Sequence, residues 1–295
     1  MRGKFWRLSV RVVGVLFITF ALLAGLIWVE TNALQVEQVV VPIIGLPPEL
    51  DGLRIALISD LHGRKLQPNS RLVQTVQGSG VDLIAAAGDF VDRDTNEMAN
   101  VLPLMQALTG IAPVYAVSGN HDYWADWPII AGQLRQVGVT VLENSSVILK
   151  RGNAVYCLAG VADHYSGQAD LEQAIPEQWE GPIILLSHSP TLFDPGWGSN
   201  YLESGSADWP VRQQLLQRVS LTLSGHTHGG QIKIPFIGAL SNATGEWFPK
   251  QHVQGLSQEQ HGWLYISRGL GTTGLVRARF LSRPELTILT LLMER

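Results

Sequence analysis

The stretch Val117-Ser118-Gly119-Asn120-His121-Asp122 places an amide, an imidazole and a carboxylate directly after a short apolar run, Val114 to Val117. The run predicts a buried strand, and the glycine at its end permits a tight turn. Other segments with aspartate or histidine after an apolar run are Ser59-Asp60-Leu61-His62, Gly88-Asp89, Leu186-Ser187-His188-Ser189 and Gly225-His226-Thr227-His228. These five segments contain five of the eight histidines of the chain.

The chemistry of these groups indicates a metal site. Imidazole and carboxylate groups are the usual protein ligands of divalent transition metals. Asp60 and His62 are two residues apart, so at an extended strand end both can face the same side. His226 and His228 have the same spacing. Asp89 has two carboxylate oxygens and can bridge two cations, and we therefore predict a catalytic metal site.

Each of these residues alone also has an ordinary structural interpretation. Asp60 and Asp89 could cap helices that follow their strands, and Asn120 after a glycine is a normal turn residue. His188 could be a hydrogen-bonded interior histidine. Five segments in this order, each after an apolar run, are not explained by such roles.

The pattern around the segments predicts a layered α/β domain, because strands and helices alternate. Predicted helices cover residues 72–76, 97–108, 129–137, 171–175 and 211–219. Predicted strands cover residues 36–44, 53–58, 81–87, 114–117, 147–149, 155–161, 183–186, 221–223, 264–266 and 286–292. The longest irregular part is residues 190–210, which we interpret as a loop over one edge of the domain.

Composition limits the function classes. The chain has 295 residues, of which 46% are hydrophobic and 16% charged, so a filled core is expected and disorder is not. The formal net charge of −4 gives no general attraction to nucleic acid, and no nucleic-acid binding is expected. The single cysteine, Cys157, cannot form an internal disulfide and is interpreted as a small buried hydrophobe.

The N-terminus predicts a membrane anchor. Residues 12–29 are uncharged and mostly apolar, and residues 8–10 extend the stretch, which matches the roughly 20 residues that span a bilayer. Basic residues precede or enter it at Arg2, Lys4, Arg7 and Arg11, and none follows until Arg54. The positive-inside rule then places the N-terminus in the cytoplasm and the remaining chain outside. The alternatives are a secretory signal cleaved near Thr31-Asn32-Ala33 and a buried helix of a soluble protein.

With these motifs the chain resembles the calcineurin-like metallophosphoesterases over residues 49 to 292. The family pattern is Asp-x-His, Gly-Asp, Gly-Asn-His-Asp/Glu, a lone His and Gly-His-x-His, and every element is present. The segments Ile58-Ser59-Asp60-Leu61-His62 and Ser224-Gly225-His226-Thr227-His228 are similar to sequences of the bacterial membrane-associated branch of the family. That branch includes phosphodiesterases and a hydrolase of UDP-2,3-diacylglucosamine in lipid A synthesis.

The resemblance implies the fold and the domain organisation. The expected fold is a four-layer α/β/β/α sandwich of two mixed sheets, with the site at the carboxyl ends of the strands and one transmembrane helix before it. Residues 1–30 would be the membrane anchor. Residues 31–48 would connect it, with the first strand, to a catalytic domain at residues 49–295. The chain would be a single-pass protein of the bacterial inner membrane, with an extracytoplasmic catalytic domain.

The resemblance also implies a role for each site residue. Asp60, His62 and His228 would hold the first metal, and Asn120, His188 and His226 the second, with Asp89 bridging both. His121 would assist the leaving group, and Asp122 would orient His121 through a hydrogen bond. The set lacks thiolates, so two divalent ions of Mn, Fe or Zn are expected. A hydroxide shared by the metals would attack a phosphodiester or pyrophosphate.

Three functional hypotheses follow. The first is a metal-dependent phosphoric ester or pyrophosphate hydrolase. The second narrows the substrate to a lipid-linked pyrophosphate such as UDP-2,3-diacylglucosamine. That substrate is made in the cytoplasm, which conflicts with the predicted side of the membrane. The third is a metal-stabilised scaffold without catalysis, which a missing ligand would indicate, and none is missing from the sequence.

Overall fold

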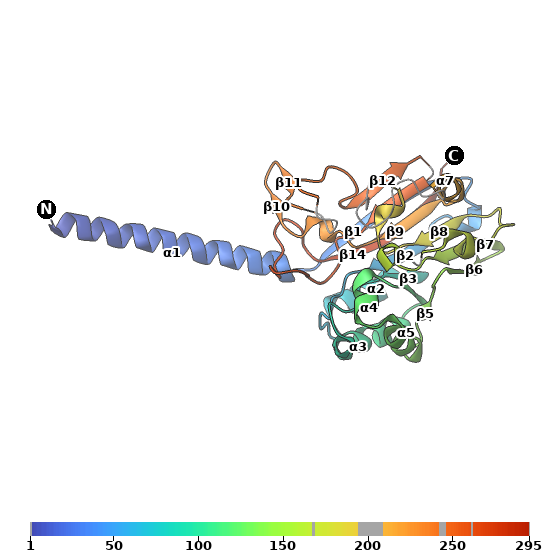
Figure 1. Cartoon of the computed structure of the whole chain (residues 1–295), viewed down its shortest axis with the longest axis horizontal. Helices are drawn as coiled ribbons and strands as arrows, with labels where there is room; N and C mark the ends of the chain where they lie inside the picture. The colour runs from blue at the N-terminus through green and yellow to red at the C-terminus, as the bar shows by residue number, and fades with distance from the viewer. Residues whose placement is uncertain (1, 167–168, 194–208, 242–245, 261, 295) are drawn as a thin grey trace.

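The computed structural model describes residues 2–166, 169–193, 209–241, 246–260 and 262–294. Two six-stranded sheets pack face to face, helices cover their outer faces, and a long N-terminal helix projects from the domain (Figure 1). This is the predicted arrangement of two mixed sheets in an α/β sandwich.

The first sheet has the order β1-β14-β2-β3-β4-β5. Strands β2 to β5 are parallel, β14 is antiparallel to β2, and β1 is parallel to β14. Side chains alternate along each strand, so Ile84 and Ala86 of β3 face helices while Leu83 and Ala85 face the other sheet. The strands are β1 Gln35–Ile44, β2 Arg54–Ile58, β3 Leu83–Ala87, β4 Val114–Val117, β5 Thr140–Val141 and β14 Glu285–Glu294. The covering helices are α2 Arg71–Ser79, α3 Met98–Thr109 and α5 Trp127–Gln136.

The second sheet has the order β12-β13-β9-β8-β7-β6. Its central strands are parallel, and an antiparallel pair closes each edge. Its strands are β6 Ser145–Arg151, β7 Ala154–Gly160, β8 Ile183–Leu186, β9 Leu221–Ser224, β12 Gly255–Glu259 and β13 Gly262–Ile266. The outer face packs on α6 Leu171–Ala174 and α7 Trp209–Leu216, where Cys157 is fully buried, as the sequence predicts.

The core between the sheets is made of large aliphatic side chains from both. Leu57, Leu83 and Leu289 come from the first sheet, and Leu158, Leu186 and Leu223 from the second, all with an exposed fraction of 1% or less. Burial of this apolar surface fixes the distance between the two sheets. The carboxyl ends of both sets of parallel strands consequently meet above one shared core.

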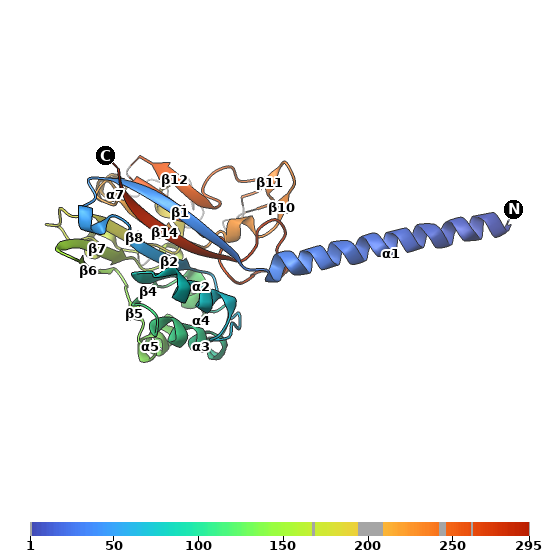
Figure 2. The same ribbon diagram turned by 180° about the vertical axis from the view of Figure 1, so that it is seen from behind.

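Helix α1, Arg2–Asn32, leads directly into β1, which lies beside β14 along the back of the domain (Figure 2). Among the described residues, Arg11–Asn32 is the one helical segment long and apolar enough to cross a membrane, and no residue of its most apolar 18-residue window is buried. The helix ends two residues beyond the predicted anchor. A signal sequence passes the same test of length and composition.

Some short elements were not predicted. They are helix α4 Asn120–Ala125 and the strands β5, β10 Lys233–Ile234, β11 Gly238–Ala239 and β12. They also include 3-10 helices at Pro48–Leu50, Thr95–Glu97, His164–Ser166, Pro190–Phe193 and His228–Gly230. Helix α4 begins on Asn120 itself, so its first turn consists of candidate site residues and has no apolar signal. Residues 194–208 of the predicted loop lie outside the described residues.

Leu289→Ala should destabilise the fold by about 2–5 kcal/mol, because it leaves a cavity between the two sheets. The matched control is Leu292→Ala in the same strand, where the side chain is 38% exposed and a loss below about 1 kcal/mol is expected. Urea unfolding of the detergent-solubilised protein, followed by circular dichroism, measures both. Equal losses would contradict the packing of the Leu289 side chain between the two sheets.

Candidate metal centre

The five sequence segments end strands at one edge of the two sheets. Asp60, Asp89 and Asn120 follow β2, β3 and β4, which are parallel neighbours in the first sheet. His188 and His226 follow β8 and β9, parallel neighbours in the second sheet. The backbone N–H of His226 donates to Asp60 Oδ1 at 2.9 Å and so ties the two sheets together at this edge.

Most of the candidate ligands lie where the backbone turns sharply. The left-handed region, which non-glycine residues rarely adopt, contains Asp60, His62, Asp89, His226 and His228, with φ between 44° and 70°. Such conformations cost free energy and persist only where the surrounding structure enforces them. After these turns the side chains lie next to one another at the ends of the strands.

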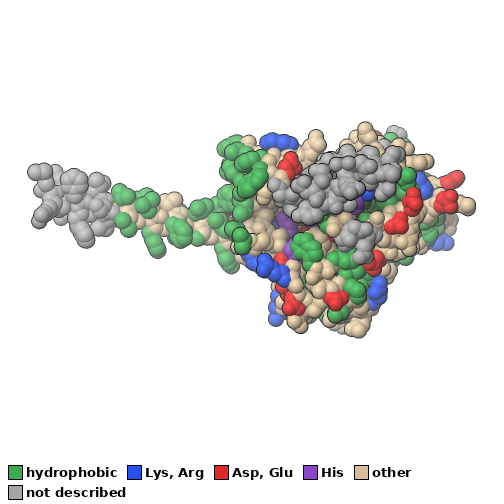
Figure 3. Space-filling model, viewed as in Figure 1, with side chains coloured by type: hydrophobic (Ala, Val, Ile, Leu, Met, Phe, Trp, Pro, Cys, Tyr) green, Lys and Arg blue, Asp and Glu red, His purple; other side chains and the backbone are tan. Residues whose placement is uncertain are grey.

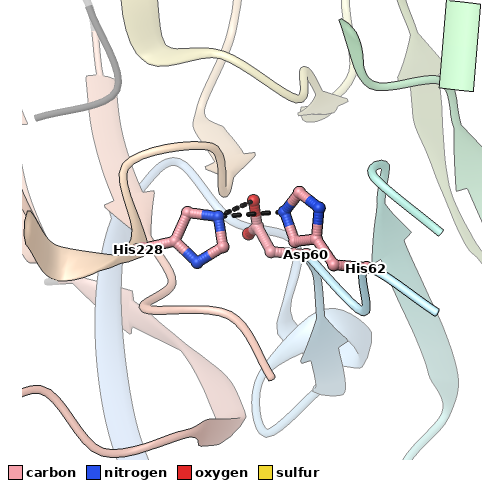
Figure 4. Close-up of side chains that lie close together, drawn as sticks. All are labelled: Asp60, His62 and His228. Carbon is pink, nitrogen blue, oxygen red and sulfur yellow. Dashed lines mark hydrogen bonds and ion pairs between the residues drawn. The ribbon is translucent and has the colours of Figure 1, made fainter. Parts of the chain in front are cut away.

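Asp60, His62 and His228 form the first group, and Figure 4 shows their side chains pointing toward one another. His62 Nε2 lies 3.0 Å from His228 Nε2, which in turn lies 3.5 Å from Asp60 Oδ1. All three side chains are buried. The family resemblance implies that these residues hold one metal, and the structure brings them together.

The second group is made of Asp89, Asn120, His188 and His226. Asn120 Oδ1 lies 3.0 Å from His226 Nδ1 and 3.2 Å from His188 Nε2, and the two histidine nitrogens are 3.1 Å apart. His188 Nδ1 is 2.7 Å from the carbonyl of Ala87, which fixes the ring. The far side of that ring therefore faces Asp89 and Asn120.

Asp89 connects the two groups. Its Oδ2 lies 3.5 Å from His62 Nε2 and 3.2 Å from His188 Nε2, so one carboxylate oxygen faces a ligand of each group. Its Oδ1 accepts a hydrogen bond of 3.0 Å from the backbone N–H of His121. This placement is what a bridging carboxylate requires.

Two glycines allow the aspartates to pack this closely. A Cβ atom on Gly119 would lie 2.2 Å from Asp89 Oδ1, and one on Gly225 would lie 2.4 Å from Asp60 Oδ2. Any side chain at either position would therefore displace a candidate ligand.

Electrostatics within the site favour cations. Burial alone would lower the pKa of His188, but the charge of Asp89 and its hydrogen bond raise it to about 10. Burial would raise the pKa of Asp89, yet the charge and hydrogen bond of His188 hold it well below its usual range. Burial and the charge of His188 lower the pKa of His226 to about 3. A protonated His188 thus balances Asp89, and a divalent cation on His188 would displace its proton.

The residues present fit a pair of divalent metal ions. Two buried imidazole nitrogens that face each other at 3.0 Å cannot both use their lone pairs without a proton or a cation between them. Carboxylate, imidazole and amide donors without thiolate suit Mn, Fe or Zn. The convergence of these donors is what distinguishes the site from a set of separate caps and turns.

Asp122 has a different role from the predicted one. Its carboxylate is fully buried and does not bond to His121; it accepts hydrogen bonds from the backbone N–H groups of Asp89, Phe90, Val91 and Gly119 at 2.8–3.2 Å. His121 and Asp122 are consecutive residues of α4, and consecutive residues of a helix do not face each other, so the Asp122 carboxylate does not reach the His121 ring. Burial and the charge of Asp89 raise the pKa of Asp122 to about 7. Asp122 thus joins the turn after β3 to the turn after β4.

Asp92 takes the position behind His121 and was not predicted. His121 Nδ1 lies 2.6 Å from the Asp92 carbonyl and 3.5 Å from its Oδ1, and His62 Nδ1 lies 3.2 Å from Oδ1. The hydroxyl of Thr273 donates to Oδ1 at 2.8 Å, and Arg277 forms an ion pair with Oδ2. The sequence signal was a second aspartate three residues after Asp89, in the same turn.

Arg279 is a second unpredicted residue. Its side chain is fully buried, its Nη2 lies 3.2 Å from His228 Nδ1, and its nitrogens donate to the carbonyls of Arg268, Gly271 and Ser282. Burial lowers its pKa to about 9. No sequence signal distinguishes it from the other arginines of the loop after β13.

His121 is the candidate site residue nearest to solvent. Its side chain is 16% exposed, whereas those of His62 and His188 are fully buried. Its ring centroid lies 4.7 Å from that of His62 and 4.5 Å from that of Trp124, which is itself 69% exposed. Among the candidate site residues, His121 therefore has the most contact with solvent.

Asp92→Asn should weaken metal binding about 10–100-fold, because Asp92 holds the ring of His62 from behind. Asp94→Asn is the matched control, since Asp94 is exposed and only caps the next 3-10 helix. Competition with a metal chelator measures both affinities. Equal affinities of the two variants would contradict the assigned role of Asp92.

The chain has extended similarity to several curated proteins. A "Transmembrane protein with metallophosphoesterase domain" of Danio rerio is 32% identical over 285 residues, 88% of this chain and 58% of that protein. The uncharacterized metallophosphoesterase YkuE of Bacillus subtilis is 29% identical over 90% of this chain and 87% of its own length. Phosphodiesterase YaeI of Escherichia coli is 28% identical over 81% and 82%. The chain thus spans little more than half of the Danio rerio relative.

A family model described as calcineurin-like phosphoesterase matches residues 53–230, which include all seven candidate ligands. Proteins of this family depend on divalent metals and act on phosphoester substrates. The match covers more than half of the chain and agrees with the two-sheet fold and the strand-end site. The chain belongs to the calcineurin-like phosphoesterase family.

Proposed function

We propose that the chain is a dinuclear metal-dependent phosphoesterase that hydrolyses phosphodiester or pyrophosphate bonds. The observation that supports this most strongly is the convergence of donor atoms into three overlapping groups, each within 4.8 Å: Asp60, His62 and His228; His62, Asp89 and His121; and Asp89, His188 and His226. A non-catalytic scaffold would have no need for this complete set of ligands.

In this proposal Asp60, His62 and His228 would hold one metal. Asn120, His188 and His226 would hold the other, and Asp89 would be a ligand of both. When bound, divalent cations of Mn, Fe or Zn supply charge neutralisation at the phosphoryl oxygens and a water of lowered pKa. The residues of the chain orient these ligands: Ala87 fixes His188, Asp92 fixes His62, and Asp122 fixes the turn that carries Asp89.

His121 is proposed as the general acid. Its Nδ1 is placed to donate to the Asp92 carbonyl at 2.6 Å, which leaves Nε2 to hold a proton for the leaving oxygen. Its partial exposure allows that proton to be replaced from solvent. Asp122 acts only indirectly, through the backbone of the residues around Asp89.

Different observations favour a phosphodiester and a lipid-linked pyrophosphate as the substrate. The name of YaeI favours a phosphodiester. An apolar helix at the N-terminus, and an exposed Trp124 against His121, favour a substrate with an apolar part, such as the lipid-linked pyrophosphate UDP-2,3-diacylglucosamine.

We propose that residues 1–30 anchor the chain in a bacterial inner membrane. Residues 31–48 would connect this anchor to the catalytic domain, residues 49–295.

Asp89→Asn should abolish turnover of an aryl phosphodiester, because both metal groups lose their shared carboxylate. His121→Ala should lower kcat about 10²–10⁴-fold while leaving the metal content largely intact. The measurement is chromogenic hydrolysis by the purified, metal-reconstituted chain, with metal content determined in parallel. His252→Ala, a histidine that pairs with Glu259 and belongs to neither group of candidate ligands, is the control.

Unchanged activity in the purified Asp89→Asn variant would rule out the proposed reaction. If His121→Ala lost both its metal and its activity, His121 would belong to the metal ligands, and this result would contradict its role as a general acid.

The side of the membrane is tested separately. Because Arg2, Lys4, Arg7 and Arg11 precede or enter the apolar stretch and no basic residue follows it until Arg54, a C-terminal alkaline phosphatase fusion should be active and a green fluorescent protein fusion dark in a bacterial host. The opposite result would place the domain in the cytoplasm. That result would contradict the extracytoplasmic prediction and favour the nucleotide-linked lipid.

A further inference from the structure

Two loops carry large apolar side chains into solvent beside the base of α1. The turn between β10 and β11 holds Phe236, which is fully exposed, and Ile237, which is 50% exposed. The loop after Gly271 holds Leu275, also fully exposed, and Val276, which is 58% exposed. We call these four residues the apolar tips. Figure 3 shows apolar side chains gathered at this end of the domain, on the side where Figure 1 places β10 and β11.

The two loops are held together as one surface. The backbone N–H of Lys233 donates to the carbonyl of Phe280 at 2.9 Å, and that of Phe280 donates to the carbonyl of Gln231 at 3.0 Å. The side chain of Gln231 donates to the carbonyls of Thr273 and Val276 and accepts from the N–H of Thr273, at 2.9–3.0 Å. The tips are therefore braced by hydrogen bonds at both loops.

The same surface is continuous with α1. A cavity between α1 and the second loop is lined by Arg277 and Ala278 on one side and by apolar residues of α1, from Phe20 to Trp28, on the other. Below it, Glu30 pairs with Arg283 at 2.6 Å, and the Thr31 hydroxyl accepts from the N–H of Arg279 at 2.9 Å. These contacts fix the second loop against the last turns of the helix.

The contacts of the second loop with α1 determine how deep the apolar tips lie relative to a bilayer that α1 crosses. The apolar window Arg11–Asn32 is about 33 Å long at 1.5 Å per residue, close to the roughly 30 Å of a hydrocarbon core. Arg277 and Ala278 lie beside the part of that window that follows Phe20. If the window crosses a bilayer, the tips next to these residues reach its surface.

The charges beside the tips fit a lipid surface. Lys233 precedes the first turn, and Arg277 follows the second tip, with its side chain 51% exposed. Apolar side chains flanked by basic ones are typical of segments that insert between anionic headgroups. Apolar groups exposed together beside a candidate membrane span differ from the single exposed apolar residues of an ordinary surface.

We propose that Phe236, Ile237, Leu275 and Val276 insert into the surface of the phospholipid bilayer that α1 crosses, as a second membrane contact. Arg277 pairs with Asp92, and Thr273 donates to the same carboxylate, so the inserted loop is also bonded to the metal site. The contact thereby holds the site close to the headgroups, where it would meet amphiphilic phosphoesters. The inference rests on the membrane anchor of the proposed function and not on hydrolysis.

The test uses an environment-sensitive label on introduced cysteines in the full chain, reconstituted in vesicles of phosphatidylcholine and phosphatidylglycerol. Cys157 is fully buried, so the parent chain gives the background. Phe236→Cys and Leu275→Cys report on the tips, and Phe17→Cys reports on α1. Ile44→Cys is the aqueous control: it is 81% exposed at the far end of β1, roughly 30 Å along the strand from α1 at about 3.3 Å per residue.

We expect labels at positions 17, 236 and 275 to show blue-shifted emission, to be quenched by doxyl-labelled lipid, and to be protected from aqueous iodide. Position 44 should show none of these. If positions 236 and 275 behave like 44 while 17 is in lipid, the second contact is overturned and the anchor stands. If position 17 is aqueous too, both are overturned. Protection from iodide without lipid quenching would mean a protein contact and would also overturn the proposal.

Discussion

The carboxylate of Asp89 is the group on which the rest of the site depends. It lies within 3.5 Å of a histidine from each sheet, His62 after β2 and His188 after β8. Two sheets packed over one core bring these strand ends together, but only a shared anion can join the two clusters of imidazoles. The buried charge is stabilised by the site itself, since His188 lowers the pKa of Asp89 and Asp89 raises that of His188. Cations in place of that proton would satisfy the same charges.

The surrounding chain enforces this geometry at a cost in backbone strain. Five candidate ligands have positive φ, and glycines at 119 and 225 leave room that no other residue would. Asp122 holds the backbone around Asp89 with hydrogen bonds, and Arg279 and Asp92 support the histidines from behind. A site built on strained turns needs this second set of contacts, because the turns would otherwise relax away from the shared carboxylate.

Much of the fold could be predicted because its central strands are short apolar runs with clear ends, such as Val114 to Val117, and because site residues follow them directly. Helix α4 was missed since its first turn is made of those polar residues, and β12 since Gly255–Glu259 has no apolar run. The predicted contact of Asp122 with His121 failed on local geometry. Asp92 and Arg279 act through contacts across the fold, 51 positions along the chain between Arg279 and His228 and 181 between Asp92 and Thr273, which spacing alone does not encode.

The central claim is that two cations bind side by side and share Asp89. Electron paramagnetic resonance of the chain loaded with Mn²⁺ tests it most directly, because two ions that share ligands are exchange-coupled. Two ions that share Asp89 should give a coupled spectrum at two ions per chain, and Asp89→Asn should give the spectrum of isolated ions. A spectrum of isolated Mn²⁺ in the unsubstituted chain, or saturation at one ion, would contradict it.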